Sequence, residues 1–170
     1  MNNAVAIKNY PVAAPGWRDK EFYLWSAVFV LGNLALPQLC HLAALGGKVW
    51  LPIYFCTFLA AVLYGRNVAV LTAVLSPVLN YALFAMPAAG MLPVMMVKSL
   101  LIALLAPALV KRFSLPVALG LTIVGYQLGG AIFAGLTGGE MFADARLGWP
   151  GMIAQFAGVW LVLRLWRRAE

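Results

Sequence analysis

Six apolar segments follow one another along the chain, and each is bounded by charged residues, glycine or proline. They cover residues 22–40, 50–65, 66–86, 92–110, 115–136 and 149–166. A membrane-spanning helix needs about 20 predominantly apolar residues, which is close to the length of these segments. Long apolar runs also replace the alternating pattern that is typical of a membrane β-barrel. The pattern therefore predicts an all-α integral membrane protein with six transmembrane helices in a single bundle.

The composition agrees with this class and excludes several others. Of the 170 residues, 64% are hydrophobic and only 10% are charged. Soluble domains usually carry about 25% charged residues, and a chain of this length could not bury so much apolar surface in water. We therefore expect one transmembrane domain over residues 22–168. Residues 1–21 are expected to form a polar cytoplasmic tail, because they lack the apolar run of a signal peptide.

Lysine and arginine flank the predicted spans unevenly, within a net charge of +7. Most lie in the tail, at Arg66, in the loop at Lys111 and Arg112, and after the last span, whereas the alternate connections carry only Lys48 and Arg146. The positive-inside rule then puts both termini in the cytoplasm, as expected for a multi-pass protein of the inner (cytoplasmic) cell membrane. Because these charges flank spans, they do not form a basic patch for nucleic acid, and no nucleic-acid partner is expected. The outer loops are then residues 41–49, 87–91 and 137–148.

Strong hydrogen-bonding side chains gather in the outer half of the predicted spans. At a rise of about 1.5 Å per residue, Lys98 and Gln155 lie ~9 Å below the outer ends of their spans. Polar side chains are costly at this depth, so their gathering predicts a substrate pocket that opens outward beneath the three outer loops. The alternative is that amides such as Asn33 and Gln127 only satisfy each other between helices. The candidate substrate-binding residues are His41, Trp50, Tyr54, Asn80, Lys98, Gln127, Glu140 and Gln155.

Lys98 is the most informative of these residues. A lysine inside a span costs on the order of 3 kcal/mol unless it pairs, reaches the interface or meets a ligand. No acidic residue occurs in any predicted span, so an ion pair would have to come from Glu140 or Asp144 in the outer loop. The long aliphatic stem could instead carry the ammonium group to the membrane surface. The sequence leaves the pocket and the surface as alternatives for this side chain.

The sequence gives little support to metal binding or catalysis. Cys40 and His41 are adjacent on a helix and so do not share a face, and no further ligands follow at suitable spacing, so no metal site is expected. No positioned acid, base or nucleophile lies deep in the spans, and we expect neither an enzyme nor a cofactor. Gly46-Gly47-Lys48 is not a phosphate-binding loop, because Leu42 stands where that motif needs glycine. If the protein moves a substrate, a partner must supply the energy, unless it forms a carrier or channel by oligomerisation.

Small residues at four-residue spacing allow helices to approach closely. Three such pairs are expected to pack the bundle itself. The pair Ala69 and Ala73 lies in the cytoplasmic half of the third span and is expected to dock a membrane partner. The four pairs are Ala61/Gly65, Ala69/Ala73, Gly125/Gly129 and Ala154/Gly158.

Several short motifs carry a family resemblance: Gly47-Lys48-Val49-Trp50-Leu51-Pro52-Ile53, Gly65, Leu75-Ser76-Pro77, Asn80, Met86-Pro87 and Leu92-Pro93. Over residues 22–168 the chain resembles the substrate-binding S components of energy-coupling factor (ECF) vitamin transporters. The resemblance implies a six-helix protein that captures a vitamin or its precursor from outside. It implies as partners a transmembrane coupling subunit and two cytoplasmic ATPases. It also implies a binding site in the outer loops and at the outer ends of spans four to six, where this sequence has Lys98, Gln127, Glu140 and Gln155.

The sequence departs from this family in two respects. The family often has an alanine repeat in the first span, but here Ala27 is followed four residues later by Leu31, and only Ala69/Ala73 partly matches a related motif. The patterns expected for biotin, thiamine or riboflavin are not evident, so the substrate stays open. The alternative function is a structural or scaffolding membrane protein without a small-molecule substrate, similar to small shape-determining factors.

Overall fold

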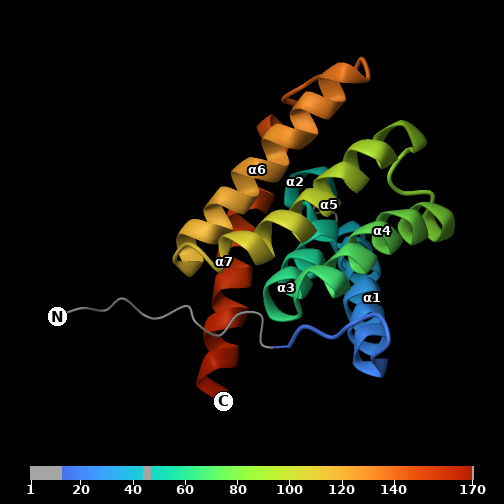
Figure 1. Cartoon of the computed structure of the whole chain (residues 1–170). Helices are drawn as coiled ribbons and strands as arrows, with labels where there is room; N and C mark the ends of the chain where they lie inside the picture. Colours follow the sequence, from blue (N-terminus) through green and yellow to red (C-terminus); the bar gives the residue numbers. More distant parts are fainter. Residues whose placement is uncertain (1–12, 44–46, 170) are drawn as a thin grey trace.

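The computed structural model describes residues 13–43 and 47–169, so most of the predicted tail lies outside the described residues. The secondary structure within this range is helical, and the helices pack side by side in a bundle (Figure 1). In chain order the elements are α1 (Lys20–Leu42), α2 (Gly47–Trp50), η1 (Pro52–Tyr54), α3 (Phe55–Leu63), α4 (Gly65–Phe84), η2 (Ala89–Met91), α5 (Leu92–Leu109), α6 (Leu115–Leu136) and α7 (Ala143–Ala169).

Four helices in the described part of the chain are long and apolar enough to cross a membrane. They are α1, α4, α6 and the segment Ala89–Leu109, which joins η2 to α5. A helix satisfies its own backbone polar groups, which is why such apolar segments fold as helices in lipid. The all-α membrane class is therefore confirmed, and the four helices coincide with the first, third, fourth and fifth predicted spans.

The second predicted span, residues 50–65, is not one continuous helix. Leu51 has a left-handed backbone conformation with φ 48°, and Pro52 follows it, so the chain turns between α2 and η1. Proline has no backbone N–H to donate and fits best in the first turn of a helix, which is its place in η1. The apolar helix that follows, Pro52–Leu63, is shorter than a span. Its residues are nevertheless buried, because α3 packs against α1, α4 and α5 inside the bundle.

The last helix, α7, begins before the sixth predicted span and has 27 residues. At 1.5 Å per residue it is about 40 Å long, which is enough to cross a bilayer. It is not among the four apolar helices, and it carries Pro150, Gln155 and Arg164. A sixth span at this position stays a prediction.

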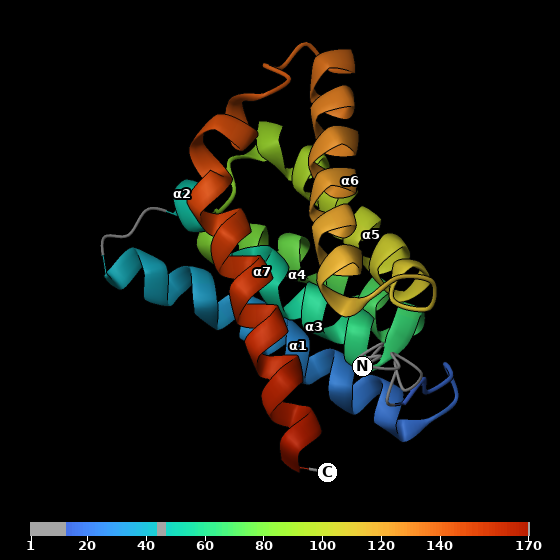
Figure 2. The same cartoon turned by 90° about the vertical axis from the view of Figure 1, so that its left-hand side faces the viewer.

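The central helix of the bundle is α5, which packs against α4 on one side and α6 on the other (Figures 1 and 2). Small residues bring α6 close to α5: a Cβ atom at Gly125 would lie 2.6 Å from Leu105, and one at Gly129 would overlap Leu101. Ala69 and Ala73 are both 0% exposed. In this structure the pair therefore packs in the core between helices. The docking role expected for Ala69 and Ala73 stays a prediction.

The short helix α2 packs against α7, far away in the sequence (Figure 2). At this contact a Cβ atom at Gly151 would lie 2.5 Å from the backbone carbonyl carbon of Trp50. Only glycine lets the two backbones approach so closely. The contact places the turn at Leu51 against the middle of the bundle, where the candidate site begins.

Candidate functional site

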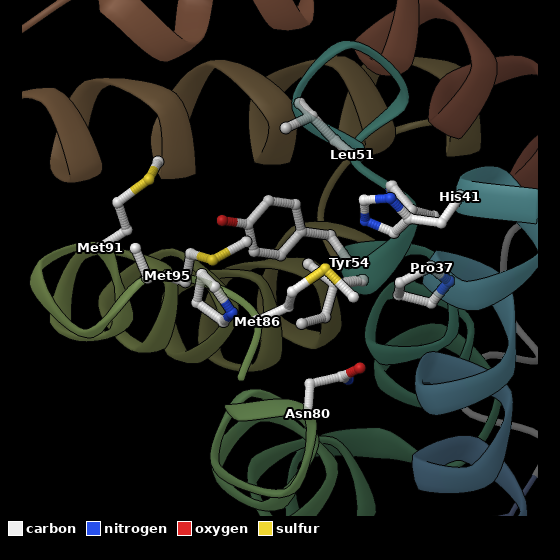
Figure 3. Close-up of a pocket in the computed structure, with 12 residues that line it drawn as sticks. Pro37, His41, Leu51, Tyr54, Asn80, Met86, Met91 and Met95 are labelled. Atoms are coloured by element: carbon white, nitrogen blue, oxygen red, sulfur yellow. The ribbon is translucent and has the colours of Figure 1, made fainter. Parts of the chain in front are cut away.

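A cavity of about 230 Å³ lies where α1 and α4 end and α5 begins (Figure 3). Three of the predicted site residues line it: His41 at the end of α1, Tyr54 of η1 and Asn80 of α4. The rest of its wall is apolar. Those residues are Pro37, Leu51, Pro52, Ile53, Met86, Pro87, Ala88, Met91 and Met95. We call this space the first cavity.

A second cavity, of about 350 Å³, lies between α5 and the end of α6. Two predicted site residues line it, Lys98 and Glu140, and glycines from α6 and the loop after it form much of its wall. Glu140 also pairs with Arg146, and both side chains are exposed. Met91 and Met95 line both cavities, so the two spaces adjoin. Residues from all three predicted outer loops are thus brought together at one end of the bundle.

Lys98 is buried rather than turned to the surface. It is 2% exposed, and its Nζ donates a hydrogen bond of 2.8 Å to Oε1 of Gln127 on α6. Its aliphatic stem lies flat against Gly130, where a Cβ atom would overlap Cγ, Cδ and Cε of the lysine. The structure therefore answers the alternative that the sequence left open: Lys98 stays inside the bundle, in the wall of the second cavity.

Gly130→Ala is expected to destabilise the protein by about 1–3 kcal/mol, because the added methyl group overlaps a buried side chain. Gly120→Ala on the same helix is the matched control, since nothing lies within 4 Å of a Cβ atom there. Removing a helical glycine in open space is expected to be neutral or to stabilise by up to about 1 kcal/mol. The measurement is thermal unfolding of the purified variants in detergent.

The same measurement in a Lys98→Ala background tests the cause. If the lysine stem is what the methyl group meets, the penalty of Gly130→Ala should vanish once the stem has been removed. An unchanged penalty in that background would contradict the contact between Lys98 and Gly130.

Asn33 is at the centre of a second buried polar cluster. Its Nδ2 donates to Oγ1 of Thr57 at 2.8 Å and to Oγ of Ser76 at 3.1 Å, while its Oδ1 accepts from the backbone N–H of Cys56 at 3.0 Å. These bonds tie α1 to α3 and α4. Asn33 thus joins helices through its side-chain amide, as the alternative from the sequence had it. Its partner is not Gln127, however, because Gln127 accepts a hydrogen bond from Lys98.

Gln155 of α7 fixes the turn that begins at Leu51. Its Nε2 donates to the backbone oxygen of Leu51 at 3.0 Å, and its Oε1 accepts from the hydroxyl of Tyr126 at 2.8 Å. Gln155 lines neither cavity, but it holds the backbone of Leu51, which lines the first one. It is therefore a positioning residue. Trp50, which is 38% exposed, also lines neither cavity.

Gln155→Leu is expected to lower the free energy of unfolding by about 2 kcal/mol, because a buried carbonyl loses its donor. Backbone amides near Leu51 should then exchange faster with deuterium. Tyr126→Phe is the matched control: it removes one hydroxyl group but leaves the bond from Gln155 to Leu51. Faster exchange near Leu51 in both variants would contradict the role given to Gln155.

The candidate site residues chosen from the sequence did not include the methionines that line the first cavity, nor Thr57, Ser76 and Tyr126. Met91 and Met95 are four residues apart and so share a helix face, which was the one available signal. Within the described residues no group of three His, Cys, Asp or Glu side chains could hold a metal ion.

Comparisons with protein-family models, curated proteins and solved structures found no match to this chain.

Proposed function

We propose that the protein is a membrane-embedded substrate-binding subunit, which captures a vitamin or a related small molecule for uptake driven by partner ATPases. The observation that carries the proposal is the buried ammonium group of Lys98 in the wall of one of two adjoining cavities. Ligand sites are typically concave, largely apolar and supplied with a few well-placed polar groups. The paired cavities have this character.

The charge of Lys98 suggests which substrate group binds there. Hydrogen bonds from a charged donor to an anionic acceptor are shorter and about twice as strong as neutral ones. Lys98 donates to Gln127, and this bond orients the ammonium group. A substrate with an anionic group, such as a carboxylate, would fit beside it in the second cavity.

The source of energy is proposed from the sequence. The chain has no phosphate-binding loop and no carboxylate in a predicted span that could carry protons or sodium ions. The resemblance to ECF S components supports a transmembrane coupling subunit and two cytoplasmic ATPases as partners. The distribution of lysine and arginine supports cytoplasmic termini, with the cavities open to the outside. Reporter fusions at both ends of the chain test that orientation, and a terminus found outside would contradict it.

Native mass spectrometry of the purified protein tests the proposed function directly. We expect a small molecule to remain bound after extraction into detergent and to be released on unfolding. In parallel, a thermal-shift screen against vitamins should identify a compound that raises the melting temperature, since a ligand that binds only the folded state must stabilise it. If no bound molecule is found and no vitamin stabilises the protein, the proposal fails and the scaffolding alternative stands.

A further inference from the structure

One buried acceptor in the first cavity lacks a hydrogen-bond donor. Asn80 is 1% exposed, and its Nδ2 donates to the backbone oxygens of Ser76 and Asn33, both at 3.0 Å. Because carbonyl groups can only accept, the NH₂ group of the amide must face these two partners. The other amide atom, Oδ1, accepts no hydrogen bond within residues 13–43 and 47–169. Buried polar atoms are rarely left without a partner, so Oδ1 indicates a donor that arrives with an occupant of the cavity.

The surroundings of Asn80 favour an apolar ring as the carrier of that donor. Met86, Met91, Met95 and the ring of Tyr54 lie around the same space (Figure 3). Thioether sulfur makes favourable contacts with aromatic rings, and the unbranched methionine side chain adapts to their shape. Water alone suits the space poorly, because a buried water molecule needs two to four polar partners and this wall is mostly apolar.

The first cavity also adjoins the second cavity, whose wall contains Lys98. Met91 and Met95 form part of both walls, so an occupant of the first cavity lies next to the second. A molecule with a ring in the first cavity and an anionic group in the second would use the polar groups of both spaces. Its ring would contact the thioethers, and its anionic end would lie beside Lys98.

We propose that the substrate is an organic anion built on a flat, apolar ring system with an N–H or O–H donor. Oδ1 of Asn80 accepts a hydrogen bond from this donor, while the anionic group binds Lys98. This inference rests on the proposed function and narrows the class of substrate that the protein captures.

A pair of probes that differ only in the donor tests the inference: indole-3-propionate and 1-methylindole-3-propionate. Both have the ring and the carboxylate, but the methyl group removes the N–H donor. Isothermal titration of the purified protein in detergent should give an affinity about tenfold or more higher for the N–H compound, since the unmethylated ring gives Oδ1 its missing partner. In Asn80→Leu the two affinities should become equal. Equal affinities in the unmodified protein, or no binding of either probe, would overturn the inference.

A second variant keeps the test valid if Asn80→Leu does not fold, because that change also removes the two bonds of Nδ2. Ala88 is exposed and lines the first cavity, so Ala88→Trp should fill the space without touching those bonds. The neighbouring Ala89 is exposed and lies outside the lining, which makes Ala89→Trp the matched control. Binding of both probes should be lost in the first variant and kept in the second. Tight binding retained in Ala88→Trp would place the probes elsewhere and overturn the inference.

The two proposals fail in different ways. If the purified protein carries a small molecule in native mass spectrometry but does not distinguish the probes, the substrate class is wrong and the proposed function stands. If the protein carries no molecule, no vitamin stabilises it and neither probe binds, both proposals fail.

Discussion

Lys98→Met is expected to weaken the binding of an anionic substrate by about 10- to 150-fold. A hydrogen bond to a charged group contributes about 1.5–3 kcal/mol, and each 1.4 kcal/mol is a factor of ten in affinity. Methionine keeps an unbranched stem of similar shape against Gly130, so the substitution removes the charge and its donors while largely preserving the packing. The measurement is isothermal titration in detergent with the compound that stabilises the protein in the vitamin screen.

Lys111→Met is the control for this prediction. Lys111 is exposed in the connection that follows the end of α5, whereas both cavities lie at its beginning, and it lines neither of them. Its replacement removes the same charge from the protein and should leave the affinity unchanged. If Lys98→Met also binds with unchanged affinity, the lysine does not contact the substrate, and the prediction is wrong.

Asn33→Leu is expected to lower the free energy of unfolding by about 2–4 kcal/mol. The substitution leaves the backbone N–H of Cys56 without an acceptor and removes the donor that Thr57 and Ser76 share. Each buried polar group left without a partner costs about 1–3 kcal/mol, although single hydrogen bonds between membrane helices average only about 0.6 kcal/mol. The large effect is expected because one side chain serves three elements at once. Thermal unfolding in detergent measures it.

Asn67→Leu is the matched control for Asn33→Leu. Asn67 is half-buried at the start of α4 and makes one long hydrogen bond, 3.4 Å from Nδ2 to the oxygen of Pro15. Its loss should cost less than about 1 kcal/mol. A similar loss of stability in the two variants would contradict the view that the bonds of Asn33 hold α1, α3 and α4 together.

The two predictions separate the polar residues by their roles. Both polar atoms of the Asn33 side chain form hydrogen bonds to neighbouring helices, so its replacement should lower the stability of the protein. Lys98 lies in a cavity wall, and its charge should act on binding. Sequence position alone did not distinguish them, because both are polar residues inside apolar segments and both carry the same cost of burial.

The sequence was enough to predict that the candidate site residues gather at one end of the bundle, because this follows from the direction in which each span crosses the membrane. Consecutive spans alternate in direction, so alternate connections meet at the same end of a bundle. The spans also place Asn80 towards the end of α4 and Lys98 near the beginning of α5, which brings both to that end. The residues then line two cavities, with His41, Tyr54 and Asn80 in one and Lys98 and Glu140 in the other. This division could not be read from the pattern, because it depends on where the methionines of η2 and α5 lie between them.

The sequence by itself determined the class of this protein, because in lipid an apolar run must satisfy its backbone within its own helix. That rule is local, and it correctly located α1, α4, α5 and α6. Only the tertiary structure decided which polar atoms meet. Ser76 rather than Gln127 shares the amide of Asn33, and Gly130 receives the stem of Lys98. Oδ1 of Asn80, a residue of the first cavity's wall, has no donor within the described part of the chain. Each of these outcomes depends on the rotation of one helix against another that is distant in sequence, and local periodicity carries no information about that rotation.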